Sequence, residues 1–349
     1  MIISLDAMGG DQAPEVTVHG AVWAARDFGI TIQLVGHPDK IEAELVKHDT
    51  TGLDLLIVPA SQVIEMDDQP AEAVRAKKDA SMNVAMQQVK TGQSQAFVSA
   101  GNSGGVLAAA LFGLGRIRGI KRPALSTIFP TVSERGFCFV LDVGATTDAK
   151  PEYLYQFALM GAVYSERVLG VKSPQVGLLS TGEEEGKGSK LVIETTPYLK
   201  NGPFNFVGNV EGKDVPAGQV DVIVTDGFTG NVFIKTSEGI AKFVLATIRE
   251  EFMKRPAAKA GAFLARGAFQ AIRTKLDDRE FGGGALLGVN GVVIVTHGRS
   301  DAYMIRNSIR VAKAAVENDI INAIKSYQYQ LSPFAEDKSK ENKSLEAAG

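Results

Sequence analysis

AFVSAGNSGG, residues 96–105, is a short apolar run that passes directly into a glycine-rich loop. The same unit opens the chain, where Ile2–Leu5 is followed by DAMGGD. Short apolar runs recur along the chain with helical stretches between them, which predicts an α/β fold with a mainly parallel sheet covered by helices. The remaining runs are Ile32–Val35, Leu55–Val58, Phe137–Leu141, Val176–Leu179, Val222–Val224 and Val292–Val295.

Glycine-rich loops follow several of these predicted strands. In open parallel sheets ligands bind at the carboxyl ends of the strands. Glycine lets backbone N–H groups approach an anion, and the helix that follows offers its amino-terminal dipole. The loops together predict a phosphate or oxyanion site, although any one of them could be only a tight turn. They are DAMGGD (6–11), SAGNSGG (99–105), STGEEEGKG (180–188), TDGFTGN (225–231) and VTHGRSD (295–301).

Length and composition favour one large α/β domain over residues 1–335, or two closely packed lobes, followed by a disordered tail at 336–349. The 37 basic and 40 acidic residues give a net charge of −3, which argues against a nucleic-acid partner. The one cysteine, Cys138, excludes an internal disulfide and lies in an apolar run typical of an inert core residue. No apolar stretch is long enough to cross a membrane, so a cytoplasmic location is expected.

Familiar cofactor motifs fail on spacing. The lysine of GEEEGKG arrives one residue too early for a Walker A loop and is followed by Gly188. No G-x-G-x-x-G opens the first strand-to-helix turn, and the four histidines lack the spacing of zinc ligands. We therefore expect no cofactor and no metal.

A serine hydrolase is the main rival function. Gly101–Gly105 fits the G-x-S-x-G nucleophile elbow, and Asp226 and His297 follow Ser103 in the chain order of an α/β-hydrolase triad. The pattern arises easily in a glycine-rich loop, and no HGGG-type stretch completes an oxyanion hole. Ser103 could instead cap a helix. A non-catalytic module that binds acyl chains or a carrier protein is the second alternative.

Three polar residues are the main catalytic candidates. Lys187 is expected to open a helix after a strand, where it would supply positive charge for phosphate. Asp226 and Asn231 flank the G-F-T-G turn, and Asn231 could donate to a developing oxyanion. Asp226 and Asn231 could instead cap their own turn, and Lys235 and His297 are equally open to a structural reading.

Six motifs in order resemble the bacterial phosphate acyltransferase family over about residues 1–330. The resemblance implies a Rossmann-like three-layer α/β/α fold, related to the isocitrate and isopropylmalate dehydrogenases and to phosphotransacetylase. It also implies transfer of an acyl group from acyl carrier protein to inorganic phosphate. Ala145 departs from the asparagine expected in many members. The motifs are LDAMGGDQAPE, VIEMDDQPAEAVRAKKDASM, VSAGNSGGVLA, LDVGA with Asp148, STGEEEGKGS and TDGFTGNVFIKTSEG.

The family's site carries over onto the glycine-rich loops. Beside the catalytic candidates, it implies phosphate or oxyanion contacts and weaker candidates near the first strand. The acyl-phosphate product would pass to a membrane acyl-phosphate:glycerol-3-phosphate acyltransferase, and a homodimer is expected. The phosphate-binding set is Asn102, Ser103, Gly104, Thr181 and Gly230, and the weaker set is Asp6, Gly9 and His297.

The segment 254–279 is a basic, amphipathic stretch in a slightly acidic protein. Acyl carrier proteins are strongly acidic, so this stretch is expected to bind the carrier or an anionic membrane surface as a helix. Its apolar residues could instead pack in a dimer interface. The residues expected at this surface are Lys254, Arg255, Lys259, Phe263, Leu264, Arg266, Phe269, Arg273 and Lys275.

Overall fold

The structure, a computed structural model, describes residues 1–331, so the tail expected at 336–349 lies outside the described residues. Within residues 1–331 an 11-stranded sheet runs in the order β3-β2-β1-β4-β11-β10-β5-β6-β9-β7-β8. The strands are β1 (Ile2–Asp6), β2 (Thr31–Gly36), β3 (Leu55–Pro59), β4 (Ala96–Ser99), β5 (Ala124–Pro130), β6 (Phe137–Leu141), β7 (Gln175–Ser180), β8 (Asn205–Glu211), β9 (Val222–Val224), β10 (Gly284–Leu287) and β11 (Val292–Val295).

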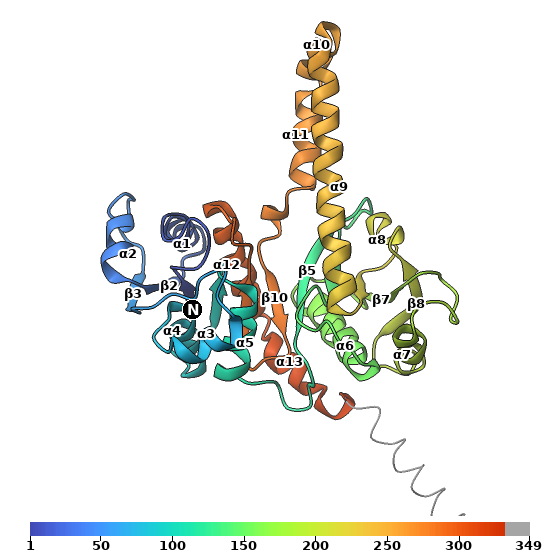
Figure 1. Cartoon of the computed structure of the whole chain (residues 1–349), viewed down its shortest axis with the longest axis horizontal. Helices are drawn as coiled ribbons and strands as arrows, with labels where there is room; N and C mark the ends of the chain where they lie inside the picture. Colours follow the sequence, from blue (N-terminus) through green and yellow to red (C-terminus); the bar gives the residue numbers. More distant parts are fainter. Residues whose placement is uncertain (332–349) are drawn as a thin grey trace, which may run out of the picture.

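Two groups of parallel strands define two lobes, which flank the centre of the molecule in Figure 1. The first lobe holds β3, β2, β1, β4 and β11, and the second holds β6, β9, β7 and β8. Between them, β10 is antiparallel to both of its neighbours, and β5 is antiparallel to β6. The predicted α/β fold with a mainly parallel sheet is confirmed.

All eight apolar runs singled out in the sequence are strands, but three further strands were missed. β8 contains Gly208 and Asn209, β5 mixes polar with apolar residues, and β10 follows a run of three glycines. Their patterns are weak because strand propensity reflects burial against neighbours more than any backbone preference. The missed strands β5 and β10 join the two lobes.

Helices pack on the sheet through apolar faces. In the first lobe α1 packs on α12, and in the second lobe α6 packs on β6, β9 and α7. The helices of the body are α1 (Glu15–Phe28), α2 (Pro38–Leu45), α3 (Pro70–Ala76), α4 (Ser81–Lys90), α5 (Ser103–Gly113), α6 (Pro151–Arg167), α7 (Lys190–Lys200), α8 (Asp214–Ala217), α12 (Ala302–Glu317) and α13 (Ile320–Ser326), with 3-10 turns η1 (Asp278–Glu280) and η2 (Gln328–Gln330).

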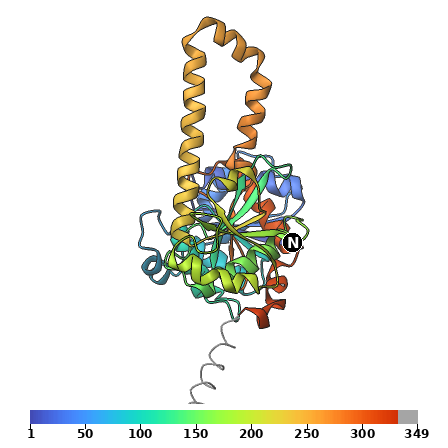
Figure 2. The ribbon, with the colours of Figure 1, turned by 90° about the vertical axis from the view of Figure 1, so that its right-hand side faces the viewer.

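A helical arm, residues 227–276, projects from the body (Figures 1 and 2). α9 (Gly227–Lys254) runs outward, α10 (Pro256–Leu264) forms the tip, and α11 (Arg266–Lys275) returns. Gly227 and Gly230, in its first turn, are the buried residues of α9, so the rest of the helix lies outside the core. None of the helices in residues 1–331 is long and apolar enough to span a membrane.

Candidate functional site

Loops after three neighbouring strands meet at the carboxyl edge of the first lobe. β4 lies between β1 and β11, so the loops that follow these strands begin side by side. The Asp11 N–H donates to the Gly298 carbonyl at 2.8 Å, and the Thr296 N–H donates to the Ser99 carbonyl at 2.9 Å. The glycine-rich loops 6–11, 99–105 and 295–301 therefore form one continuous cluster.

Asp6, a weaker site candidate, is buried beneath this cluster. Its carboxylate accepts hydrogen bonds from the hydroxyls of Ser81 at 2.6 Å and Ser99 at 2.8 Å. Burial raises the pKa of Asp6, while these hydrogen bonds oppose the rise. A Cβ atom at Gly9 would lie 2.6 Å from Asp6 Oδ2 and 2.8 Å from Gly101 N, so only glycine fits there. These contacts favour a role for Asp6 in positioning the loops.

Asn102 caps α5, and its amide group is fully committed to the protein. Its Oδ1 accepts the Gly105 N–H at 3.0 Å. Its Nδ2 donates to the carbonyls of Glu65, Met66 and Asp68 at 3.1 to 3.3 Å. The predicted oxyanion contact through this side chain is therefore not supported, because neither amide hydrogen points to a free site.

Ser103 is the first residue of α5, and Gly104 is the second. The Ser103 side chain is exposed, and the capping residue is Asn102, so the alternative of Ser103 as the helix cap is wrong. No hydrogen bond joins Ser103, Asp226 and His297 in residues 1–331. Asp226 binds Thr229, and the carboxylate beside His297 is that of Asp278. The structure thus lacks the assembled triad that a serine hydrolase requires.

Asp226 and Asn231 lie at the start of α9, on the second lobe. Asp226 accepts from the N–H of Thr229 at 2.9 Å and from its hydroxyl at 2.7 Å, so it is the helix cap. Asn231 is exposed, one turn into the helix. A Cβ atom at Gly230 would lie 2.0 Å from the Asp142 carbonyl oxygen, so glycine is required where α9 crosses β6.

Asp142, which the sequence reasoning missed, organises the second lobe's edge. Its Oδ1 accepts the N–H groups of Leu125, Gly144 and Ala145 at 2.9 to 3.1 Å, and its Oδ2 accepts that of Thr146 at 2.6 Å. Burial raises the pKa of Asp142 to about 6, although the N–H bonds oppose the rise. The Gly227 N–H donates to the Thr146 carbonyl at 2.8 Å, so the loop held by Asp142 supports the start of α9.

The missed signal was a repeated pattern. LD followed by a glycine-rich loop occurs at residues 5–10, where Asp6 supports the first lobe, and again at 141–144. The repeat was not recognised as significant, because a sequence does not distinguish a buried aspartate from an exposed one.

Lys187 lies in the loop between β7 and α7 and does not open the helix as predicted. α7 begins at Lys190, after the cap Ser189. The Lys187 N–H donates to the Glu184 carbonyl at 2.9 Å, and the Ser180 hydroxyl donates to the Lys187 carbonyl at 3.3 Å. The Lys187 side chain is exposed and makes no ion pair within residues 1–331. Thr181, in the same loop, is also exposed. β7 is parallel to β9 and β9 to β6, so Lys187, Asn231 and the Asp142 loop share one edge.

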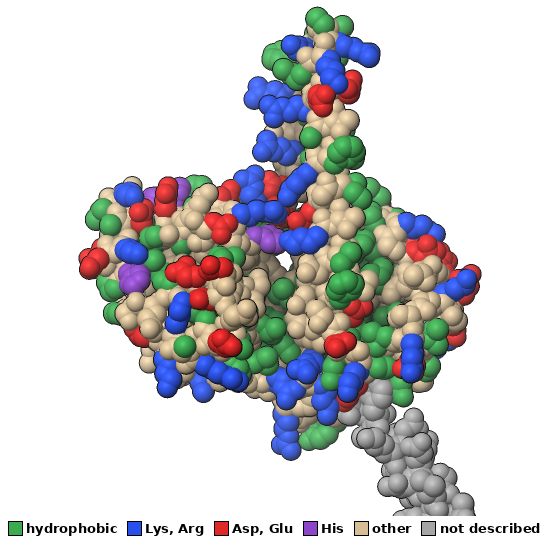
Figure 3. Space-filling view, viewed as in Figure 1, with side chains coloured by type: hydrophobic (Ala, Val, Ile, Leu, Met, Phe, Trp, Pro, Cys, Tyr) green, Lys and Arg blue, Asp and Glu red, His purple; other side chains and the backbone are tan. Residues whose placement is uncertain are grey.

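The two lobes meet at the base of the arm. His297 and Arg299 follow β11 of the first lobe, and Lys235 and Glu238 lie on α9. Arg299 Nη2 lies 3.7 Å from Glu238 Oε2 and 3.2 Å from Oδ2 of Asp278, which begins the 3-10 turn η1 after the arm. Figure 3 shows a histidine and several basic side chains gathered there, beside a hollow between the lobes.

No direct contact joins Asn102, Lys187 and Asn231 within the described residues. A chain of contacts links the regions instead. The Asn102 loop touches the Gly298 loop through Ser99 and Thr296, and Arg299 reaches α9 at Glu238. Asn231, Lys235 and Glu238 are spaced four and three residues apart, so they share one face of α9. This chain of contacts connects the first-lobe loops with the face of α9 that carries Asn231, and Lys187 takes no part in it within the described residues.

His297, Glu238 and Asp278 come within 4.8 Å of one another, which is a spacing compatible with metal ligands. Arg299 pairs with both carboxylates, and the Lys235 ammonium lies 3.8 Å from Glu238. A divalent cation would have to displace these two basic groups. Burial, followed by the charge of Lys235, lowers the pKa of His297.

Cys138 is buried in β6, as the sequence predicted. Burial raises the pKa of its thiol to about 12, so a thiolate does not form at neutral pH. An acyl group carried on Cys138 is therefore disfavoured.

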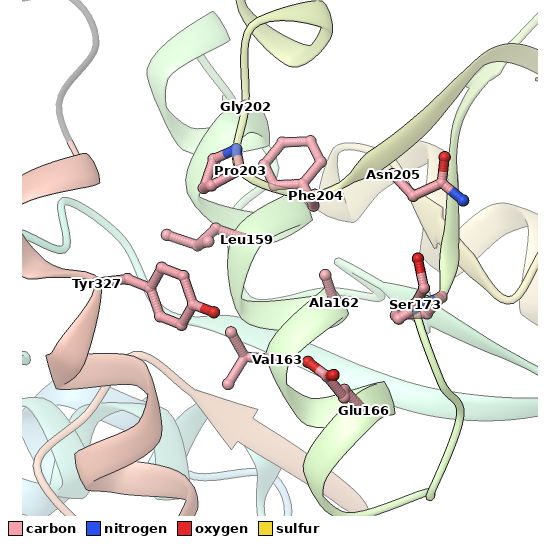
Figure 4. A pocket seen from close by; sticks show the side chains of 11 residues that line it. Leu159, Ala162, Val163, Glu166, Ser173, Gly202, Pro203, Phe204, Asn205 and Tyr327 are labelled. Carbon is pink, nitrogen blue, oxygen red and sulfur yellow. The ribbon is translucent and has the colours of Figure 1, made fainter.

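A cavity of about 640 Å³ lies away from these loops (Figure 4). Leu159 and Val163 of α6 face Tyr327 across it, and Ser173 and Gly202 precede β7 and β8. It therefore lies at the amino ends of these strands, opposite the edge that carries Thr181 and Lys187. None of the predicted site residues lines it.

Comparisons with known proteins place residues 1–323 in one family. The family model described as fatty acid synthesis protein matches residues 1–323. A phosphate acyltransferase of Geobacter sulfurreducens is 49% identical over 92% of this chain and 92% of its own length. One of Heliobacterium modesticaldum is 49% identical over 94% of this chain and 97% of its own length.

Solved structures share the fold. A phosphotransacetylase from Streptococcus pyogenes has a TM-score of 0.62 at 16% identity, covering 91% of this chain and 94% of that one. A 4-hydroxythreonine-4-phosphate dehydrogenase from Klebsiella pneumoniae has a TM-score of 0.53 at 12% identity, covering 90% and 99%. These likenesses agree with the fold type expected from the sequence.

Proposed function

We propose a specific reaction for this chain, which belongs to the phosphate acyltransferase family and is an acyltransferase of fatty acid and phospholipid synthesis. In this reaction the enzyme takes a fatty acyl group from acyl carrier protein and forms acyl-phosphate. A membrane acyl-phosphate:glycerol-3-phosphate acyltransferase would then use this product. The observation that carries the proposal is that the first-lobe loop cluster reaches α9 through Arg299 and Glu238, while the Asp142 loop of the second lobe packs against the first turn of the same helix.

The proposed reaction is direct attack. A phosphate oxygen bonds to the thioester carbonyl carbon, the C–S bond breaks, and the thiolate leaves with the electron pair. Phosphate is largely anionic at neutral pH, and an ordinary thiol has a pKa of about 8.5, so neither a strong base nor a metal is needed. The protein's task is to hold phosphate against the carbonyl and to stabilise the tetrahedral oxyanion.

Lys187 and Asn231 are the residues we propose for this task. Both are exposed at the same edge of the second lobe, and neither side chain is hydrogen-bonded elsewhere in residues 1–331. Backbone N–H groups in the first turn of α5, at Ser103 and Gly104, would contribute further donors, whereas the Gly230 N–H is already donated to the Asp226 carbonyl at 2.9 Å. Asp226 would act through its cap, by fixing the first turn of α9.

We propose that the arm carries the macromolecular contacts. Phe263 and Leu264 at its tip are 75% and 85% exposed, which suits insertion into an anionic membrane surface. Basic residues around them suit an acidic carrier protein. Phe269 packs against Phe252 at 5.3 Å between ring centres, so it supports the arm more than it offers a contact. The exposed basic residues are Lys254, Arg255, Lys259, Arg266, Arg273 and Lys275.

A homodimer through α9 is the proposed assembly. The exposed apolar residues of α9 lie three or four residues apart over much of its length, and such a stripe is normally buried against protein. A cytoplasmic enzyme that touches the membrane through the arm tip would fit these surfaces. The residues of the stripe are Phe228, Val232, Ile240, Phe243, Val244 and Ile248.

The test is to incubate the protein with long-chain acyl carrier protein and follow free thiol with and without inorganic phosphate. Thiol release that requires phosphate supports the transferase, with acyl-phosphate identified by mass spectrometry. Release without phosphate would favour the hydrolase, and no release would favour the binding module. Labelled acyl chain bound covalently to Ser103 or Cys138 in a single turnover would contradict direct attack.

A further inference from the structure

Two arginines at the base of the arm differ sharply in how their donors are used. Arg279 binds Asp277 through Nε and Nη2 at 2.6 to 3.1 Å and binds Asp301 through Nη1 at 2.7 Å. Arg299 makes one hydrogen bond, from Nη2 to Asp278 at 3.2 Å, and its Nε and Nη1 have no protein acceptor within residues 1–331. Arg279 therefore has a structural role, because it links η1 to the start of α12. Most N–H donors of Arg299 remain free to bind a ligand.

Lys235 and His297, beside Arg299, also have side-chain nitrogens without a hydrogen-bond partner in the described residues. The Lys235 ammonium approaches Glu238 only to 3.8 Å, and His297 Nε2 approaches Asp278 only to 3.9 Å, both beyond hydrogen-bonding distance. Neither side chain forms a hydrogen bond with another described residue. Three nitrogen-bearing side chains from two lobes thus face one region with donor capacity left over.

Their position matches that of the proposed reaction. Arg299 directly follows Gly298, whose carbonyl accepts the Asp11 N–H in the first-lobe loop cluster. Lys235 lies one helical turn beyond Asn231 on α9. An anion held by Arg299 and Lys235 would lie between the first-lobe loops and Asn231.

We propose that Arg299, Lys235 and His297 form the binding site for inorganic phosphate, with Arg299 as its main ligand. The proposal rests on the proposed function, which supplies phosphate as the substrate. The planar fork of Arg299 can bind two phosphate oxygens at once, and Lys235 adds a point charge from the other lobe. A site shared by two lobes would fix phosphate relative to a thioester held in the same cleft.

Glu238 and Asp278 also face this site, and they oppose an anion. Their distances of 3.7 and 3.2 Å from Arg299 are longer than the usual 2.7 to 2.9 Å of a strong charged hydrogen bond. We infer that they hold Arg299 loosely in place and yield to phosphate. Removing one of them should therefore strengthen phosphate binding.

The experiment is titration of the full-length protein with inorganic phosphate, followed by 31P NMR line broadening, which needs no acyl substrate. Arg299→Gln should raise the phosphate Kd about tenfold or more, the range expected for loss of charged hydrogen bonds. Arg299→Lys should recover part of the binding, and Glu238→Gln should lower the Kd. Lys242→Gln, two turns further along α9, is the matched control and should leave the Kd unchanged.

Wild-type affinity in folded Arg299→Gln, or no phosphate binding by the wild-type protein, would overturn the site. Circular dichroism and thermal unfolding of each variant establish that it is folded, and Arg279→Gln should lower the melting temperature without changing the Kd. If phosphate binds through Arg299 but thiol release does not depend on phosphate, the site stands and the proposed acyl transfer falls.

Discussion

The body and the helical arm differ in how far their side chains are buried and hydrogen-bonded. In the body, Asp6, Asp142 and Asn102 are buried and hydrogen-bonded to several partners each. On the arm, Phe243 and Leu264 are 70% and 85% exposed. The body completes its own contacts, whereas the arm presents apolar surface that becomes buried only against something else. Substitutions in the body should therefore affect stability and catalysis, and those on the arm should affect association.

The strongest challenge to this contrast is Asp142→Ala. It would leave the N–H groups of Gly144, Ala145 and the buried Thr146 without their acceptor, so we expect a loss of about 3 kcal/mol in the free energy of unfolding. Urea unfolding followed by circular dichroism measures it. Asp148→Ala, at an exposed position of the same loop region, should change stability little.

Asp142 also gives the body a pH dependence. Its pKa is raised from 3.8 to about 6, so the folded state holds the proton more tightly than the unfolded state. Its contribution to stability is fully present below pH 3.8 and is lost as the pH rises through about 6. The urea midpoint of the wild type, measured relative to that of Asp142→Asn, should therefore decrease as the pH is raised from 3.8 to about 6. A difference between the two midpoints that stays constant over this range would contradict the raised pKa of Asp142.

Lys187→Ala tests whether the second lobe's exposed edge is catalytic. We expect kcat/KM to fall about a hundredfold or more, since one electrostatic donor to an oxyanion contributes on this scale. The melting temperature should stay constant, because the Lys187 side chain makes no ion pair in residues 1–331. Lys190→Ala, exposed at the start of α7, is the control, and equal losses in both variants would refute a specific role.

Phe263→Glu with Leu264→Glu tests the arm. Carboxylates at two exposed tip positions should remove binding to anionic vesicles while leaving the melting temperature unchanged. Flotation with vesicles that contain anionic lipid measures binding. Val46→Glu, an exposed apolar position on the body, is the control. Unchanged flotation would leave the tip as a protein contact instead.

Ser103→Ala should have the smallest effect. Because Ser103 is exposed and hydrogen-bonded to neither Asp226 nor His297, we expect phosphate-dependent thiol release within about tenfold of wild type. Loss of activity by several orders of magnitude, of the kind that follows removal of a nucleophile, would restore the hydrolase.

Much of the fold followed from local pattern, and much of the site did not. Most of the eight apolar runs are strands buried on both faces, which must be apolar throughout, whereas β3 is an edge strand and is partly exposed. The central strands β5 and β10 were not predicted, because the glycines at 282–284 and the polar residues of β5 interrupt any continuous apolar run. The glycine-rich loops do lie at the carboxyl ends of the strands, but the hydrogen bonds from Asn102 to three carbonyls depend on residues 65–68, more than thirty positions away.

Periodicity and glycine content are local properties of the chain, so they were enough to predict the α/β class, and the six motifs were enough to identify the family. The tertiary structure determines which polar side chains have all their hydrogen-bonding groups paired and which keep unpaired donors. Asp142 and Arg279 are saturated, and Arg299 is not, although all three are ordinary charged residues in the sequence. That difference arises only when distant backbone groups and charges are brought together, because a hydrogen bond depends on distance and direction in space.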